Sequence, residues 1–212
     1  MMLAIIYAPL DDSPTSVSNA AGISLKEELD RRQIKNYYIP TRYCRREIFE
    51  EISEAAPEDI FILYAGHGER DKFLGSLRYQ WRVRRKAMVD LDNREWLKGH
   101  ILALSCWTAK ELGKKVWEEE LVESFCGCLI PMYVAYTKDD RDYKKDWVEV
   151  FGLVYPITLF ETNEPERAFQ EMKKAIEEKI KLYKLNHDKW IYAEHYASRF
   201  YSNFKNMKLY KR

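Results

Sequence analysis

The amino-acid sequence predicts an α/β protein with a mostly parallel central sheet and helices on both of its faces. Continuous apolar runs at 3–8, 60–65 and 100–104 have the length of strands that are buried on both sides. Stretches with helical spacing separate these runs, and strands that alternate with helices form βαβ units with parallel pairing. We therefore expect a three-layer sandwich.

The N-terminal part of the chain alternates between the two kinds of element. The first apolar run leads into a polar loop, after which Ser16 or Ser18 is expected to cap a helix that continues to about Arg32. A short strand at 37–39 and a helix at 43–55 follow, and each is stopped by a proline.

A different pattern occupies residues 73–90, between the second and third apolar strands. The segment RYQWRVRRKAM alternates aromatic and basic side chains, which is typical of a half-exposed hairpin. Basic and aromatic residues also occur together on nucleic-acid-binding surfaces. An aromatic face that packs inward and a basic face in water explain the alternation, so we do not expect nucleic-acid binding. The basic side chains are those of Arg78, Arg82, Arg84, Arg85 and Lys86.

The C-terminal half continues the alternation. Asp92 is expected to cap a short turn before the strand at 100–104. The pattern then predicts helices at 108–125, 142–155 and 164–186, a fourth strand at 129–136 and another helix from Asp188.

We expect residues 1–212 to form one domain, because the sequence has neither an internal repeat nor a Gly/Ser-rich linker. Residues 187–212 are an aromatic-rich C-terminal extension. Most of its aromatic side chains are expected to cover the flank of the sheet, and a remaining stripe could support a homodimer.

Composition narrows the class of protein. The chain has 212 residues, and an apolar content of 46% excludes a disordered protein. A formal charge of +1 excludes a strong overall electrostatic attraction to nucleic acid or anionic lipid. The absence of an apolar run of ~18 to 20 residues argues against a membrane span. We expect a cytoplasmic protein with reduced thiols, and a charged fraction of 33% is typical of thermophiles.

Two of the apolar strands deliver reactive side chains at their carboxyl ends. The sequence ILYAGHGER places His67 after one strand, and ILALSCWTA places Cys106 after another. If these strands are parallel neighbours, the imidazole and the thiol face one crevice, as a cysteine nucleophile and its base require. The backbone amides of Gly68 and Cys106 are then candidate oxyanion donors.

The combination of an apolar strand ending in YAGHG with a later one ending in LSC resembles the caspase-like cysteine peptidases. LSCWTAKELG is similar to the nucleophile stretch of the CHAT domains, and CGCLIPMYVAYTKDDRDYKKDWVEVF and ERAFQEMKKAI resemble the segments that follow it there. The resemblance covers roughly residues 3 to 182, and its specific part lies in 60–69 and 100–113. It implies a caspase/hemoglobinase-like fold.

The same resemblance implies the activity. His67 would be the general base and acid, Cys106 the nucleophile, and the amides of Gly68 and Cys106 the oxyanion hole of a cysteine endopeptidase that acts on peptides without a metal or other cofactor. The alternative is a catalytically inactive caspase-like scaffold that serves as a binding module. A nucleotide-binding α/β domain is disfavoured, because GHG matches neither phosphate-binding glycine pattern.

Asp11 and Asp12 suggest the specificity. In caspases, the loop after the first strand supplies an Arg to the pocket for a P1 Asp, whereas residues 9–24 of this chain contain no Arg or Lys. Two carboxylates in that loop favour substrate binding through a basic P1 residue.

The remaining candidates have simpler interpretations. Cys126 and Cys128 flank Gly127 without further ligands in sight, so we expect core packing there and no metal site. We expect structural or solvent-facing roles for His100, His187 and His195. Asp139 and Asp140 are expected either to line the crevice or to form a solvated turn.

Overall fold

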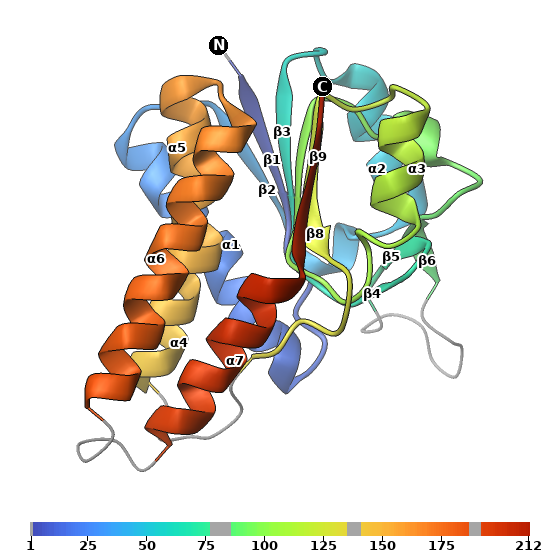
Figure 1. The fold of residues 1–212 in the computed structure, drawn as a ribbon. Helices are drawn as coiled ribbons and strands as arrows, with labels where there is room; N and C mark the ends of the chain where they lie inside the picture. The colour runs from blue at the N-terminus through green and yellow to red at the C-terminus, as the bar shows by residue number, and fades with distance from the viewer. Residues whose placement is uncertain (1, 77–85, 135–140, 187–191) are drawn as a thin grey trace.

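The computed structural model describes residues 2–76, 86–134, 141–186 and 192–212. The described residues form a six-stranded sheet. Figure 1 shows this sheet between two layers of other elements. The first five strands of the sheet pair in parallel, and the last pairs antiparallel to its neighbour. Their order is β2 (Asn36–Ile39), β1 (Leu3–Tyr7), β3 (Ile60–Tyr64), β7 (His100–Ala103), β8 (Ser124–Cys128) and β9 (Met207–Lys211). The predicted α/β class, the mostly parallel sheet and the helices on both faces are confirmed.

In the described part of the chain, five helices cover one face of this sheet (Figure 1), and a π-helical turn (Val148–Val154) joins two of them. They are α1 (Ser13–Arg31), α4 (Arg141–Trp147), α5 (Tyr155–Thr162), α6 (Pro165–Leu185) and α7 (Ala193–Asn206). The other face carries α2 (Arg46–Ala55), α3 (Leu112–Glu118) and a small antiparallel sheet of β4 (Gly68–Glu69), β5 (Lys72–Leu74) and β6 (Ala87–Val89). Short 3₁₀ turns occur at Thr41–Tyr43 and Arg94–Trp96.

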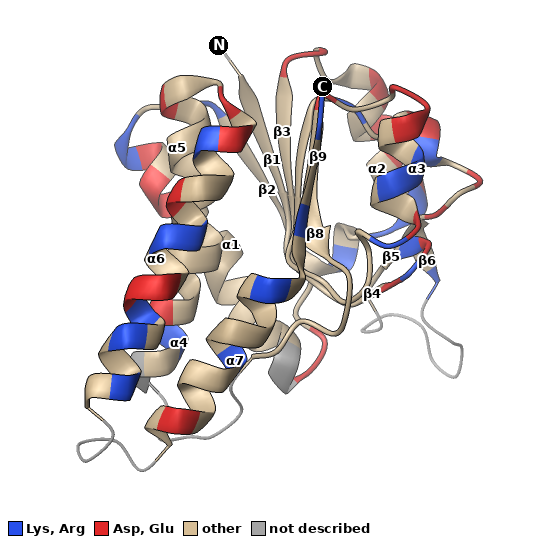
Figure 2. Cartoon of the chain, viewed as in Figure 1, with Lys and Arg blue, Asp and Glu red and all other residues tan. Residues whose placement is uncertain are grey.

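The apolar runs form strands because both faces of the sheet are covered. Along β1, Ala4 and Ile6 pack into the core under α1 and α6, while Leu3, Ile5 and Tyr7 pack into the core under α2 and α3. Successive side chains of a strand point to opposite faces, so a strand buried on both sides needs an apolar residue at every position. Figure 2 shows the charged residues on the helices, the loops, the small antiparallel sheet and β9, away from the central strands.

The fourth strand lies earlier than expected. Residues 129–134 do not form a strand, so the prediction of one at 129–136 was wrong over its described part. The strand is β8, whose sequence SFCGC has little β propensity but pairs with β7 on one side and β9 on the other. The preceding helix is correspondingly shorter than the predicted 108–125. Phe125 of β8 packs on Gly113 of α3, where an added Cβ would lie 2.5 Å from the ring.

The C-terminal tail becomes part of the sheet. The expected helix corresponds to α7, and the last residues form β9, an edge strand that the sequence analysis did not foresee. Buried aromatic side chains join α7 to the helices beside it, and Phe200 contacts Tyr143, Phe151 and Tyr183. The extension therefore covers one face of the sheet and also lengthens the sheet itself.

Several predicted features lie outside the described residues. They include most of the basic hairpin, with Arg78, Arg82, Arg84 and Arg85, and also Asp139, Asp140 and His187. The ends of the hairpin region that are described, β5 and β6, pair antiparallel. No helix within the described ranges combines the length and apolar character needed to cross a membrane.

Two residues with a positive φ lie next to the ends of secondary-structure elements: Gly99 precedes β7, and Gln33 follows α1. Gly99 has a φ of +66°, and an added Cβ would lie 2.2 Å from the carbonyl oxygen of Ile60. Gln33 has a φ of 59° just after α1, where its N–H donates to Asp30 O and the N–H of Ile34 to Leu29 O.

We predict opposite effects of substitution at these two positions. Gly99→Ala should lower the free energy of unfolding by about 2–4 kcal/mol, because it adds both left-handed strain and a backbone collision. Gln33→Gly should leave the stability unchanged or raise it by up to about 1 kcal/mol, because glycine tolerates the left-handed conformation. Urea unfolding measures both, and a Gly99→Ala protein as stable as the wild type would contradict the assigned backbone.

Candidate active site

The candidate site lies where β3 and β7 end. These two strands are parallel neighbours with Tyr64 opposite Ala103, so the segments that follow them emerge at the same edge of the sheet. His67 and Cys106 both line a small cavity of about 110 Å³ there. Its other lining residues are Thr15, Ser18, Gly66, Leu104, Ser105, Met132 and Val134. The structure thus brings the two predicted reactive side chains to one cavity.

Close packing of backbones holds the two segments together. A Cβ added at Gly68 would lie 2.5 Å from Thr108 Cγ2 and 2.9 Å from the carbonyl oxygen of Cys106. Only glycine permits this approach, which explains the second glycine of the GHG sequence. Gly68 and Cys106, the residues whose amides were expected to stabilise an oxyanion, therefore lie on segments in direct contact.

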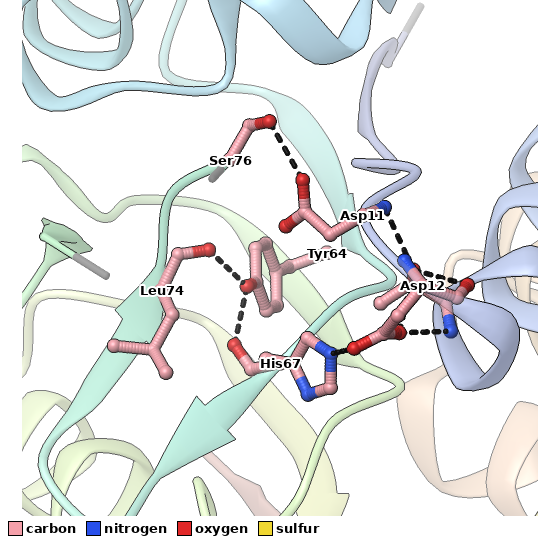
Figure 3. A network of polar contacts seen from close by, with 7 residues as sticks. Asp11, Asp12, Tyr64, His67, Leu74 and Ser76 are labelled. Carbon is pink, nitrogen blue, oxygen red and sulfur yellow. Dashed lines mark hydrogen bonds and ion pairs between the residues drawn. The ribbon is translucent and has the colours of Figure 1, made fainter. Parts of the chain in front are cut away.

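The main chain of His67 is anchored from the small sheet. The N–H of Leu74 donates to the carbonyl of His67 at 3.0 Å. The hydroxyl of Tyr64, the last residue of β3, lies within hydrogen-bond distance of the carbonyls of both His67 and Leu74 (Figure 3). The turn that carries the imidazole is therefore tied both to β3 and to β5.

The imidazole of His67 contacts the start of α1. Its Nε2 lies 2.7 Å from Oδ2 of Asp12, as Figure 3 shows. Asp12 is also the residue that caps α1: its Oδ1 accepts from the N–H of Thr15, and the N–H of Asp12 donates to Thr15 Oγ1. The predicted caps Ser16 and Ser18 were wrong, because the helix already begins at Ser13. The Asp-x-x-Thr spacing was the sequence signal for this cap.

The neighbouring carboxylate points elsewhere. Oδ1 of Asp11 accepts a hydrogen bond of 2.7 Å from Ser76 Oγ. Asp11 and Asp12 were predicted together as substrate-binding residues, and the structure separates them, since Asp12 contacts the imidazole and Asp11 the segment after β5. Their role in binding substrate stays a prediction.

The thiol of Cys106 is partly buried and has a backbone partner. The N–H of Met132 donates to Cys106 Sγ at 3.4 Å, and it is the one hydrogen bond to this sulfur from the part of the chain that the structure describes. Burial raises the pKa of Cys106 above the ordinary value of a thiol. Burial therefore favours the thiol over the thiolate at this position. Met132 was not among the predicted site residues, and it belongs to a segment that was wrongly predicted as a strand.

Trp107 makes the turn after the candidate nucleophile. Its φ is +57°, a conformation that bulky residues rarely adopt, and its N–H donates to the carbonyl of Ile130. About a third of its surface is exposed. The backbone thus turns at Trp107, and the hydroxyls of Ser105 and Thr108, on either side of this turn, contact each other at 3.0 Å.

The other cysteines belong to the core. Cys44, Cys126 and Cys128 are buried, and burial raises the pKa of each thiol, to about 12 for Cys44. Within the described ranges, no cluster of His, Cys, Asp or Glu is arranged to hold a metal ion.

Two of the histidines expected to have other roles are described. His100 is buried at the beginning of β7, at the end of that strand away from the cavity, where its Nδ1 lies 2.9 Å from Ser124 Oγ. Desolvation lowers the pKa of this imidazole. His195 lies on α7 and contacts Arg199.

The short turn before β7 also differs in detail from the prediction. Asn93 rather than Asp92 precedes the 3₁₀ turn, and its side chain accepts a hydrogen bond from the N–H of Asp90.

No protein-family model, no curated protein and no solved structure matches this chain. What the site can do therefore follows from the chemistry of its own residues.

Alkylation tests the exposure and the protonation of the thiols. We predict that iodoacetamide modifies Cys106 before the other three cysteines, because these are at most 1% exposed. The rate should keep rising with pH through pH 9, because only the thiolate reacts and burial raises the pKa of Cys106. Peptide mapping by mass spectrometry measures both effects, with Cys106→Ser as the control. A rate of modification that levels off below pH 8 would contradict the raised pKa of the Cys106 thiol.

Proposed function

We propose that this protein is a cysteine hydrolase that cleaves peptide bonds with His67 and Cys106. The observation that carries the proposal is that these two side chains, from neighbouring parallel strands, line the same cavity. A thiol and an imidazole that line one cavity at the carboxyl edge of a parallel sheet are suited to acyl transfer.

The proposed reaction has two steps. The sulfur of Cys106 attacks the peptide carbonyl carbon while His67 takes the thiol proton, and His67 then gives this proton to the leaving amine as the C–N bond breaks. Water, deprotonated by His67, releases the acid from the thioester and restores the thiol. The amides of Gly68 and Cys106 would stabilise the oxyanion of each tetrahedral intermediate.

The burial of Cys106 bears on the timing of proton transfer. Because burial raises the pKa of the thiol, a preformed thiolate is disfavoured in the free protein. His67 would then remove the proton as the substrate arrives. The N–H of Met132, already directed at the sulfur, favours the negative charge that develops there.

The alternative proposal is an inactive scaffold with the same fold. The partly buried thiol of Cys106 favours this alternative, because its sulfur already accepts a hydrogen bond from the N–H of Met132. A peptide acyloxymethyl ketone probe distinguishes the two functions, because its covalent capture requires an activated thiol. Labelling of Cys106 that disappears in His67→Ala supports the hydrolase, whereas equal labelling of both proteins supports the scaffold.

We predict that Cys106→Ala lowers the rate of peptide cleavage by at least about 10⁴-fold, because it removes the nucleophile. The free energy of unfolding should change by no more than about 1–2 kcal/mol, since a small, partly exposed side chain is truncated. Cleavage of a mixed peptide library, followed by mass spectrometry, measures the activity. Cys126→Ala, which removes a thiol of β8 that is buried in the core, is the matched control and should remain active. A Cys106→Ala protein that still cleaves would end the proposed role of this residue.

We also propose a preference for a basic P1 residue, and Asp11 is the residue that tests it. Asp12 contacts His67, so its removal would affect every substrate, whereas Asp11 contacts Ser76. Asp11→Asn keeps the shape of the side chain and removes its charge. We expect kcat/KM for peptides with Arg at P1, relative to Gln at P1, to fall about 10- to 100-fold. If the ratio of kcat/KM for Arg and Gln at P1 stays unchanged, Asp11 does not bind the P1 side chain.

A further inference from the structure

We infer that Asp12 is a positioning residue that determines which nitrogen of His67 carries the proton, so that Nδ1 is the basic nitrogen available to Cys106. This inference rests on the proposed function for its consequence in catalysis. Its structural part concerns only the contact between Asp12 and the imidazole.

The carboxylate of Asp12 is held in place by α1. Oδ1 accepts from both the N–H and the hydroxyl of Thr15, at 3.1 and 3.0 Å, and the N–H of Asp12 donates back to Thr15 Oγ1 at 2.9 Å. With Oδ1 committed to the helix cap, Oδ2 is the oxygen directed at His67. Thr15 is buried and also lines the cavity, so the cap belongs to the wall of the site.

A carboxylate oxygen accepts hydrogen bonds and has no proton to donate. At the 2.7 Å separation from Asp12 Oδ2, the Nε2 of His67 must therefore carry hydrogen. In the neutral imidazole, the other nitrogen, Nδ1, then has a free lone pair. This is the nitrogen that can take a proton from Cys106, and the imidazolium that results stays paired with Asp12.

The imidazole is thus restrained from two directions. Asp12 holds the ring at Nε2, and the contacts of Leu74 and Tyr64 with the carbonyl of His67 hold its backbone. These contacts come from α1, β5 and β3, which are separate elements of the fold. A ring restrained in this way needs little reorganisation when the substrate binds.

Asp12→Asn tests the inference, because the helix cap determines how the new amide is oriented. The amide oxygen must replace Oδ1 to accept from Thr15, which leaves the NH₂ group facing His67 Nε2. An NH₂ group only donates, so Nε2 must become the acceptor and the proton must move to Nδ1. Asn is as good an N-cap as Asp, so we expect the variant to fold normally.

Nitrogen-15 NMR of protein labelled at histidine reads the tautomer without any substrate. The chain has four histidines, and His67→Gln assigns the signals of His67. We expect the neutral ring to carry its proton on Nε2 in the wild type and on Nδ1 in Asp12→Asn. Asp30→Asn is the matched control, since it removes a carboxylate from the same helix at its far end and should leave the tautomer unchanged. A wild-type ring protonated on Nδ1, or equal spectra for the wild type and Asp12→Asn, would overturn the inference.

Kinetics test the catalytic consequence. For peptide cleavage, we expect Asp12→Asn to lower kcat about 10²- to 10⁴-fold with little change in KM, because the basic nitrogen is lost while the cavity keeps its shape. Asp12→Ser keeps a helix cap but removes the contact with His67, and it should lower kcat while leaving both tautomers populated. A changed tautomer with full activity would exclude Asp12 from catalysis. If Asp12→Asn changes the tautomer but the wild-type protein itself cleaves no peptide, the proposed hydrolase is refuted. The action of Asp12 on the ring is then still established.

Discussion

The parallel pairing of β3 with β7 is the constraint on which the rest of the site depends. With Tyr64 opposite Ala103, the two chain segments that follow are brought to the same edge of the sheet, although His67 and Cys106 are far apart in sequence. Backbone contact between Gly68 and Cys106 then sets the distance between the two segments. A shift of register or an intervening strand would separate the imidazole from the thiol, whatever their chemical character.

The elements around this edge contribute polar groups that restrain the imidazole. Asp12 belongs to the cap of α1, Tyr64 to the end of β3 and Leu74 to β5, and each contacts His67. The thiol has a different environment, with one backbone donor from Met132 and enough burial to favour the protonated form. For the proposed hydrolase, a restrained imidazole and a thiol whose pKa is raised by burial would suit a mechanism in which the proton moves during attack. Such a mechanism differs from one that starts from a stable thiolate–imidazolium pair.

Much of the fold could be predicted from the sequence, because a strand that is buried on both faces of the sheet is a continuous run of apolar residues. The runs that form β1, β3 and β7 are apolar at nearly every position, and the last two are followed by the polar residues His67 and Cys106 that reach the cavity. The strand β8 gave no such signal, since the small residues of SFCGC are suited to close packing against α3 rather than to β propensity. The more apolar segment after it was therefore mistaken for the strand. Asp12 was recognised as notable, but its partner lies 55 residues away and no local pattern indicates it.

The sequence by itself determined the α/β class, the positions of the buried strands β1, β3 and β7, and the placement of His67 and Cys106 at strand ends, because these depend on local hydrophobic periodicity. Only the tertiary structure decided that the tail would supply β9, that Met132 would contact the sulfur, and that one carboxylate of the Asp11–Asp12 pair would contact the imidazole while the other contacts Ser76. These outcomes depend on which segments meet in space. The free energy that selects them comes from packing and hydrogen bonds between residues distant in the chain.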